Sequence, residues 1–355
     1  MEKYYEKKIR VLVVDDSAFM RKVISDILDG DDDIEVVDTA KNGFDAIEKV
    51  KELKPDVITL DVKMPGMDGL ACLKELNKIS KTPVVMLSSV TKEGAEATIQ
   101  ALADGAIDFI TKPSNIFEMN GIEKSKEIIE KIKIANNLSK NYYSSEKQKV
   151  KNKNVNNGDC NVQNLVLIGT STGGPKALQD VIPLIPENVN AAFLIVQHMP
   201  AGFTKSLADR LDNISKINVK EAEDSEVIRT GYVYIAPGDY HMMVEKNVEN
   251  TLKIKLTKDP PLGGHRPSVD IMFESVSNTG FKNVVAAIMT GMGGDGSEGV
   301  KILKKINGAH IIAQDEASCV VFGMPRVAIL TGVVDIVTPL KEISNEIMKI
   351  VGVHK

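Results

Sequence analysis

The sequence has few cysteines, no excess of basic residues and no long apolar run. Its three cysteines, Cys72, Cys160 and Cys319, are scattered without CxxC spacing, so neither a disulfide framework nor a zinc site is indicated. The net charge is -5 with both signs well mixed, which argues against nucleic acid as a partner. No apolar run reaches the roughly 20 residues that span a bilayer, so direct membrane insertion is not expected.

The first residues also lack the pattern of a secretory signal. A basic flank precedes the apolar run IRVLVV, but Asp15 and Asp16 interrupt that run too early for a signal peptide. We therefore expect a cytoplasmic protein.

The length and composition fit two soluble domains. The chain has 355 residues, 43% of them hydrophobic and 26% charged, which is enough for two full cores. We expect one domain over residues 8–136, a flexible linker over 137–163 and a second domain over 164–352. The linker is rich in Lys, Asn and Ser and poor in large aliphatic residues, so it buries too little surface to offset its ordering entropy.

Strand-like runs alternate with helical patterns in both domains, which predicts two α/β folds with mainly parallel, doubly wound sheets. The first domain offers the runs IRVLVVDD, IEVVDTA, PDVITLDV, TPVVMLSS and AIDFITKP. The second offers LVLIG, AFLIVQ, YVYIA, HMMVE, LKIKL, VVAAIM and HIIAQ. HMMVE and LKIKL are separated by the polar stretch KNVENT, which predicts a β-hairpin inserted in the second domain.

Polar residues follow several strands of the first domain. Asp15 and Asp16 close the first strand and Asp61 closes the third. The carboxyl ends of parallel strands meet at one sheet edge, and three carboxylates there favour a hard cation such as Mg²⁺. Ser88 and Lys112 end the next two strands and could supply a hydroxyl donor and a positive charge to a group placed on Asp61.

A solvated loop would explain any one of these residues alone, but the five positions together resemble the receiver domain of response regulators. The segments VDDS, LDVKMPGMDG, MLSS and GAIDFITKP carry this resemblance over about the first third of the chain. It implies a flavodoxin-like (βα)5 fold in which Asp61 accepts a phosphoryl group from a histidine kinase. It further implies that Asp15 and Asp16 hold Mg²⁺ beside Asp61, and that Ser88 and Phe109 report the change.

The second domain begins with a glycine-rich turn, GTSTGG, after its first strand. Gly169, Ser171 and Gly173 satisfy the G-x-S-x-G spacing that places a nucleophilic serine on a strand-to-helix turn. The same turn could instead cradle a phosphate with backbone N–H groups. Neither a G-x-G-x-x-G nor a Walker fingerprint is complete, so the turn alone leaves both possibilities open.

A serine nucleophile requires a base, and five histidines are available. His198 follows AFLIVQ directly and therefore lies at the carboxyl end of the next strand. His265, in a loop before a helix, is its rival. His310 opens a strand, His241 begins a hairpin arm and His354 is in the tail, so these three are less suitable.

Asp295, in the glycine-rich segment MTGMGGDG after another apolar strand, could orient the base. The resulting order Ser171, His198, Asp295 differs from that of α/β-hydrolases, but such triads are recognised by geometry and roles.

Seven segments of the second domain resemble the catalytic domain of the CheB family of chemotaxis methylesterases, over residues 165–350. They are IGTSTGG, VQHMPAGFT, EAEDSEV, YIAPGDYHM, HRPSVD, MTGMGGDG and QDEASCVVFGMP. The resemblance implies hydrolysis of glutamate methyl esters, and deamidation of glutamines, on the cytoplasmic helices of chemoreceptors. It also implies that a chemotaxis histidine kinase donates the phosphoryl group. The fusion of a receiver to an esterase-like domain leads to the further hypothesis that phosphorylation of Asp61 relieves inhibition by the receiver.

The same resemblance places Ser171, His198 and Asp295 on the family's catalytic positions. The backbone N–H groups of Met292 and Thr172 are expected to stabilise the oxyanion, with no metal or organic cofactor in this half of the chain.

Several features leave room for other interpretations. A nucleotide-binding output would use TSTGG for phosphate, and Cys319 could act as a thiol nucleophile, although a buried structural role fits its apolar surroundings better. Gly294 stands where the family often has Asn. The individual roles of Arg266, Asp270 and Glu316 do not follow from their spacing.

Overall fold

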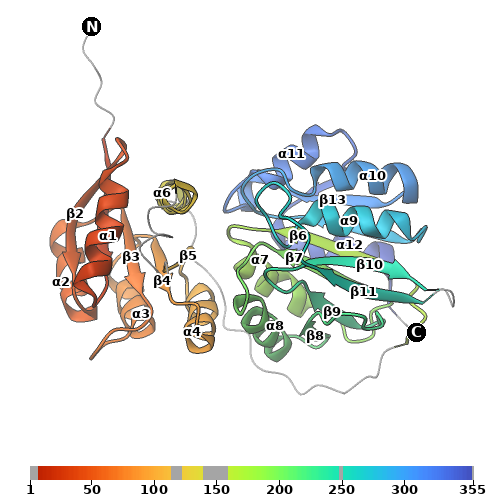
Figure 1. The fold of residues 1–355 in the computed structure, drawn as a ribbon, viewed down its shortest axis with the longest axis horizontal. Coiled ribbons are helices and arrows are strands. Elements are labelled where there is room, and N and C mark those ends of the chain that lie inside the picture. Colours follow the sequence, from red (N-terminus) through yellow and green to blue (C-terminus); the bar gives the residue numbers. More distant parts are fainter. Residues whose placement is uncertain (1–6, 113–121, 139–158, 248–250, 354–355) are drawn as a thin grey trace, which may run out of the picture. The chain divides into compact units, whose positions relative to one another are not determined.

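The computed structural model divides the chain into two compact units, Met1–Glu146 and Lys147–Lys355 (Figure 1). The residues that it describes are 7–112, 122–138, 159–247 and 251–353. Most of the expected linker falls on residues 139–158, outside the described residues. Asn137 and Leu138, which were assigned to the linker, belong to a helix.

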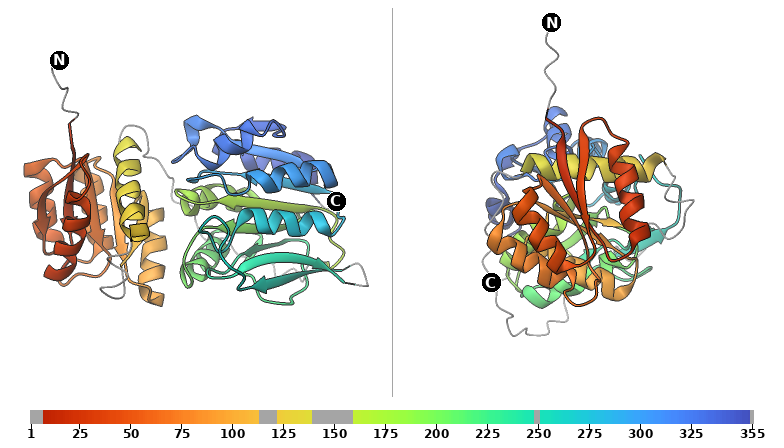
Figure 2. Two further views of the ribbon diagram at one scale, coloured as in Figure 1. Left: turned by 45° about the horizontal axis from the view of Figure 1, so that its top comes forward. Right: turned by 90° about the vertical axis from the view of Figure 1, so that its left-hand side faces the viewer.

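The first unit contains a five-stranded parallel sheet with the order β2-β1-β3-β4-β5. Its strands are β1 (Ile9–Val14), β2 (Ile34–Ala40), β3 (Val57–Asp61), β4 (Val84–Ser88) and β5 (Asp108–Thr111). Its helices are α1 (Ala18–Asp29), α2 (Gly43–Leu53), α3 (Gly69–Ile79), α4 (Lys92–Ala103) and α6 (Ile122–Leu138). Helices α1 and α6 pack together, as do α2, α3 and α4, and the two groups cover opposite faces of the sheet (Figure 2).

This sheet positions the acidic residues through its strand order. Strand order reverses between β1 and β3, and open parallel sheets usually carry their functional residues at such a point. Strands β3 and β4 are buried along their whole length, as expected for central strands of a parallel sheet. Ser17 caps α1 by accepting the Met20 N–H, so Asp15 and Asp16 lie in the short connection between β1 and α1.

The second unit contains a seven-stranded sheet, all parallel, with the order β14-β13-β12-β6-β7-β9-β8. Its strands are β6 (Leu165–Thr170), β7 (Ala192–Gln197), β8 (Asn218–Glu221), β9 (Tyr232–Ile235), β12 (Val284–Ile288), β13 (His310–Gln314) and β14 (Ile336–Thr338). Its α-helices are α7 (Gly174–Val181), α8 (Phe203–Ile214), α9 (Val269–Asn278), α10 (Ser297–Asn307), α11 (Met324–Leu330) and α12 (Leu340–Val351). The two 3₁₀ helices are η1 (Ile182–Leu184) and η2 (Glu316–Ser318).

The predicted hairpin is present and forms a separate two-stranded sheet of β10 (His241–Lys246) and β11 (Leu252–Thr257). Helix α9 packs against β10, where the Ser275 hydroxyl accepts the Val244 N–H at 2.9 Å. The predicted α/β fold class is confirmed for both units. The two edge strands of the large sheet, β8 and β14, were not predicted.

Strand order in the large sheet reverses between β12 and β6, and open α/β sheets usually bind ligands at the carboxyl ends of strands at such a point. Helices α7, α8 and α12 pack side by side, and so do α9, α10 and α11 (Figure 2). Ser171, His198 and Asp295 follow β6, β7 and β12, respectively, and therefore belong to one edge of this sheet.

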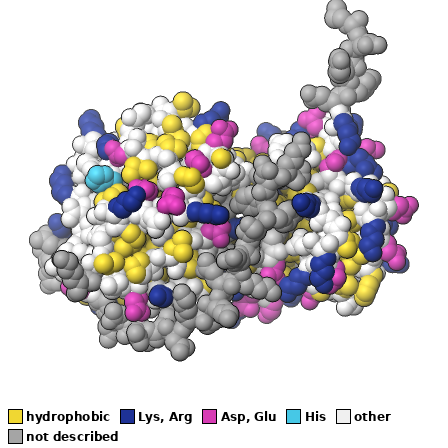
Figure 3. All heavy atoms as spheres, turned by 180° about the vertical axis from the view of Figure 1, so that it is seen from behind, with side chains coloured by type: hydrophobic (Ala, Val, Ile, Leu, Met, Phe, Trp, Pro, Cys, Tyr) yellow, Lys and Arg dark blue, Asp and Glu magenta, His cyan; other side chains and the backbone are white. Residues whose placement is uncertain are grey.

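The surface carries charges of both signs. On the face shown in Figure 3, Lys and Arg side chains are interspersed with Asp and Glu side chains. Among the described residues, no helix combines the length and apolar character needed to cross a membrane.

Candidate active site and phosphoacceptor site

Ser171 lies on a tightly fixed turn between β6 and α7. Its backbone N–H donates to the Thr290 carbonyl at 3.0 Å, and its carbonyl accepts from the Gly174 N–H at 2.8 Å and from Gln197 Nε2 at 2.9 Å. Gly173 has a φ of 78°, a left-handed conformation that few other residues adopt. The turn therefore fixes the Ser171 backbone from both neighbouring strands.

Gly291 makes room for Ser171 from the loop after β12. A Cβ atom at Gly291 would lie 2.8 Å from the Ser171 Cβ, closer than real carbon contacts allow. The Gly291 carbonyl accepts the N–H groups of Gly323 at 3.1 Å and Met324 at 2.8 Å. This loop is thus anchored directly beside the serine.

His198 is held between Thr170 and Asp295. Its backbone N–H donates to the Thr170 carbonyl at 3.1 Å, and its Nε2 lies 2.8 Å from Asp295 Oδ2. The two side chains are only 7% and 8% exposed. Because the Nε2–H donates a hydrogen bond to the carboxylate, Nδ1 is the ring nitrogen left to act as a base. Nδ1 is buried and has no hydrogen-bond partner within the described ranges.

Asp295 is fixed by the start of α9 as well as by His198. Its carboxylate accepts from Ser268 Oγ at 2.9 Å and from the N–H groups of Val269 at 2.7 Å and Asp270 at 3.0 Å. Burial raises the pKa of Asp295, but the His198 hydrogen bond and these N–H groups outweigh it and hold the pKa at about 2. The carboxylate is therefore ionised at neutral pH.

The three predicted triad residues converge on one sheet edge, but only two of them are in direct contact. In the part of the chain that the structure describes, no hydrogen bond joins Ser171 Oγ to the His198 ring. Catalytic hydrogen bonds are often long before substrate binds, so this arrangement is compatible with a serine–histidine pair.

The two predicted oxyanion donors belong to the turn after β6 and the loop after β12. Thr172 is buried, and its carbonyl accepts from Thr290 Oγ1 at 3.0 Å, whereas Met292 is 37% exposed in the loop after Gly291. Neither backbone N–H donates to another described residue. Neither N–H is therefore occupied by a bond to the described chain.

Sequence reasoning missed Gln197 and Thr290, two polar residues at the ends of β7 and β12 that support the Ser171 turn. The rule that polar groups at the carboxyl ends of strands build sites could have found both.

The rival base His265 lies in the same site, with its ring stacked on His198. Cys319 is half-buried, and burial raises its thiol pKa to about 12.

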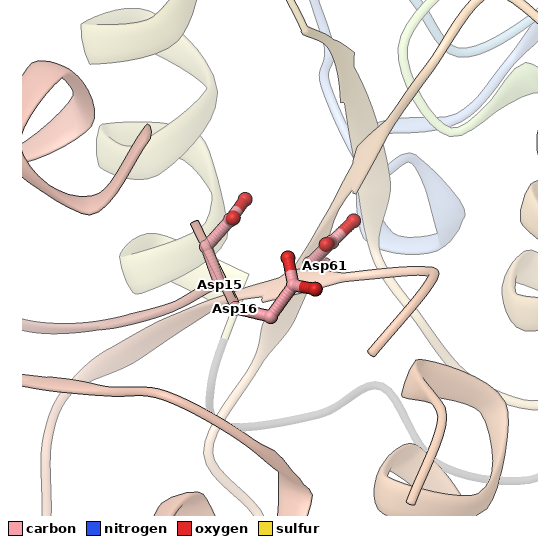
Figure 4. A group of neighbouring side chains, drawn as sticks. All are labelled: Asp15, Asp16 and Asp61. Atoms are coloured by element: carbon pink, nitrogen blue, oxygen red, sulfur yellow. The ribbon is translucent and has the colours of Figure 1, made fainter. Parts of the chain in front are cut away.

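The first unit gathers Asp15, Asp16 and Asp61 at the ends of β1 and β3 (Figure 4). One oxygen of each carboxylate lies within 4.8 Å of the others. Lys112 Nζ lies 2.6 Å from Asp15 Oδ2 and 2.8 Å from Asp61 Oδ1. Burial raises the pKa of Asp61, although Lys112 opposes this shift. Such crowded hard oxygen donors fit Mg²⁺, because a divalent cation offsets their mutual repulsion.

Ser88, at the end of β4, and Phe109, on β5, are both buried. Ser88 Oγ donates to the Gly94 carbonyl at 3.2 Å and accepts from Thr98 Oγ1 at 2.7 Å, so its hydroxyl is engaged with α4. Lys131 Nζ lies 5.1 Å from the centre of the Phe109 ring.

The fold and the two sites define a response regulator with an enzyme-like α/β output. The response regulator receiver domain family matches residues 11–128, and the CheB methylesterase family matches residues 166–347.

Relatives similar to this chain extend over nearly its whole length. The protein-glutamate methylesterase/protein-glutamine glutaminase of Halalkalibacterium halodurans is 51% identical over 345 residues, covering 97% of this chain and 99% of the relative. A protein of the same description from Syntrophomonas wolfei, numbered 1, is 46% identical over 346 residues, covering 96% and 98%. The Thermotoga maritima CheB methylesterase catalytic domain, a crystal structure, is 43% identical with a TM-score of 0.51, covering 52% of this chain and 97% of that one. The chain belongs to the CheB methylesterase family.

Proposed function

We propose that this chain hydrolyses glutamate methyl esters, and deamidates glutamines, on the cytoplasmic helices of chemoreceptors. Ser171 is the nucleophile, His198 the base and Asp295 the residue that orients it. The observation that carries the proposal is the 2.8 Å contact between His198 Nε2 and Asp295, at the sheet edge that also presents Ser171. A substrate on cytoplasmic helices places the reaction in the cytoplasm.

Acylation begins when Ser171 Oγ attacks the ester carbonyl carbon and His198 Nδ1 takes the hydroxyl proton. Asp295 keeps the other ring proton on Nε2 and stabilises the imidazolium that forms. Collapse of the tetrahedral intermediate breaks the bond to the methoxy oxygen, which leaves as methanol with the proton from His198. The product is a glutamyl ester of Ser171.

Water then attacks this ester with His198 again as the base, which restores Ser171 and releases the glutamate side chain. Deamidation follows the same steps, with ammonia in place of methanol. The N–H groups of Met292 and Thr172 stabilise both tetrahedral oxyanions, at about 3 kcal/mol per donor in comparable acyl-transfer enzymes.

The experiment is to incubate the intact protein with methylated fragments of chemoreceptor cytoplasmic helices and to measure methanol. We expect steady release, and we expect a fluorophosphonate probe to add its mass to the peptide that contains Ser171. Absence of methanol together with an unlabelled Ser171 would instead favour the nucleotide-binding output, to be checked by titration with nucleotides.

For the first unit we propose that Asp61 accepts a phosphoryl group from a chemotaxis histidine kinase. Asp15, Asp16 and Asp61 would hold Mg²⁺, which when bound neutralises charge on the phosphoryl oxygens. Lys112, already in contact with two of these carboxylates, would pair with the new phosphate.

Ser88 and Phe109 would pass the change on to the surface of the receiver. A phosphoryl oxygen on Asp61 is a stronger, charged acceptor than the Gly94 carbonyl, so the Ser88 hydroxyl would turn towards it. That rotation alters the packing between β4 and β5, where Phe109 is buried. We propose that the unphosphorylated receiver inhibits the catalytic unit, and that this change weakens the inhibition.

Asp61→Asn should abolish stimulation by a phosphodonor. With Mg²⁺ and a small acyl phosphate, the unaltered protein should release methanol about 5- to 150-fold faster, the range of typical allosteric coupling. For the variant, the ratio of rates with and without the donor should be 1. A variant that is still stimulated would show that Asp61 is not the phosphoacceptor.

A further inference from the structure

His265 covers one face of the His198 ring. The ring centroids are 4.0 Å apart and the planes differ by 7°, so the two imidazoles are stacked. Asp295 holds the Nε2 edge of the same ring at 2.8 Å. His198 is thus restrained at its edge by a hydrogen bond and over its face by a second imidazole.

The stack requires that the two rings are not both charged. His265 is partly buried, and burial together with the nearby His198 lowers its pKa to about 4. His265 is therefore uncharged at neutral pH, so a proton on His198 would not place two like charges in the stack. A neutral aromatic face is also a favourable neighbour for an imidazolium.

The loop of residues 258–268, here called the His265 loop, is closed by a buried histidine. His241 is fully buried on β10, its Nε2–H donates to the Pro260 carbonyl at 3.2 Å, and its Nδ1 accepts the Ser268 N–H at 3.2 Å. One imidazole thus joins two segments of the loop through hydrogen bonds at both ring nitrogens. Ser268 also donates to Asp295, so the same anchor supports the orienting carboxylate.

The middle of the His265 loop is fixed by its own backbone and by Arg266. Leu262 and His265 exchange two backbone hydrogen bonds of 3.1 and 3.0 Å across a turn, in which Gly263 and Gly264 have φ values of 58° and 85°. Arg266 Nη1 donates to the carbonyls of Lys258 and Asp259, at 3.2 and 3.1 Å. The backbone that carries His265 is therefore well ordered without help from the His198 ring.

We propose that His265 is a positioning residue for the reaction, and that the His265 loop holds its ring against the face of His198 so that the His198 ring cannot tilt. This inference rests on the proposed role of His198 as the base. A hydrogen bond at Nε2 leaves the ring free to tilt about the line to Asp295, and a planar group against its face removes that freedom. Nδ1 then keeps one direction towards the serine, and small misplacements of a base are costly in rate.

The test compares His265→Ala with His265→Phe in the intact protein. Alanine removes the stacked face, and we expect kcat for methanol release to fall about tenfold while KM stays within about twofold. Phenylalanine keeps a planar ring without nitrogens and should restore kcat to within about threefold. Equal rates for the unaltered protein and His265→Ala, or equal rates for the two variants, would overturn the proposal.

A spectroscopic readout separates positioning from loss of fold. The His198 Nε2 proton, identified by its disappearance in His198→Gln, should give a resolved NMR signal in the unaltered protein and in His265→Phe, and should broaden by solvent exchange in His265→Ala. An unchanged signal in His265→Ala would contradict the proposal that the His265 ring restrains His198. If His265→Ala does not fold, His265→Leu replaces it, because leucine fills a volume similar to that of histidine without a planar face. For His265→Leu we expect the same fall in kcat and the same broadening of the Nε2 proton signal as for His265→Ala.

Failure of the proposed function would be distinguishable from failure of this inference. Turnover that survives Ser171→Ala refutes the proposed catalytic roles. An activity that depends on Ser171 but is unchanged by substitution of His265 refutes only the positioning role of His265.

Discussion

Replacing Ser171 by alanine should lower kcat for methyl ester hydrolysis by about 10⁴-fold or more. The hydroxyl oxygen forms the covalent bond to substrate in the proposed mechanism, and removal of the serine from comparable triads leaves only the contribution of the oxyanion donors and of binding. Alanine is smaller than serine and fits the turn, so KM should change little. The rate is best measured in single turnovers with excess enzyme.

Cys319→Ser is the matched control for Ser171→Ala. Cys319 is the alternative nucleophile, but its thiol is half-buried with a pKa of about 12 and is therefore protonated at neutral pH. We expect this variant to keep its rate within about twofold. If Cys319→Ser lost activity while Ser171→Ala retained it, the thiol would be the nucleophile and the serine turn would be structural.

The sequence predicted the central strands well because a parallel sheet buries them on both faces. Strands β3, β4, β6 and β7 are buried throughout and mainly apolar before their last residue, which gives a nearly continuous hydrophobic signal. The edge strands β8 and β14 were missed because they are only four and three residues long and mostly half-buried or exposed. Their sequences, NVKE and IVT, carry no distinct periodicity.

The positions of the candidate site residues were predictable where they depend on strand ends and not where they depend on a loop. Asp15, Asp61, His198 and Asp295 each follow or end an apolar run, and topology alone brings such positions to one edge. The location of His265 depends instead on hydrogen bonds between segments far apart in the sequence, such as those of His241 to both ends of its loop. Local pattern contains no signal for such contacts.

The hydrogen bonds of the Ser88 hydroxyl could not be predicted from the sequence either. Its position at the end of β4 suggested a donor to the phosphoryl group, but its hydroxyl bonds to Gly94 and Thr98. The rotamer is chosen by the nearest acceptor, and the phosphoryl group that would change that choice is supplied by the reaction. The predicted role thus remains a proposal that depends on phosphorylation.

Asp295→Asn should lower kcat by about 10⁴-fold, the loss seen when an amide replaces the acid of a triad. The asparagine NH₂ can donate to Nε2 of His198, which moves the ring proton to Nδ1, the nitrogen that must accept a proton from Ser171. The variant would also lose the imidazolium's counter-charge. The pH–rate profile should therefore show a low rate throughout the neutral range rather than a shifted optimum.

The same substitution should destabilise the protein, so folding must be measured alongside rate. The pKa of Asp295 is about 2 against an ordinary 3.8, so the carboxylate stabilises the fold by about 2 kcal/mol. Because the folded pKa is the lower one, that stability is present above about pH 4 and is lost as pH falls through about 2. Asparagine should remove it, lowering the free energy of unfolding at pH 5 with a smaller difference at pH 3.

Asp270→Asn is the control for Asp295→Asn. It tests whether the loss of rate comes from removing the charge bonded to His198 or from removing any carboxylate at the start of α9. Asp270 lies beside Asp295 and accepts the Gly299 N–H at 2.7 Å, and it makes no hydrogen bond to His198 among the described residues. Burial raises its pKa to about 6, so a neutral side chain is already accessible there. We expect Asp270→Asn to stay within about threefold of the unaltered rate. If both asparagine variants lost activity equally, the two carboxylates would act by supporting the start of α9. Asp295 would then have no special role in keeping the His198 ring proton on Nε2.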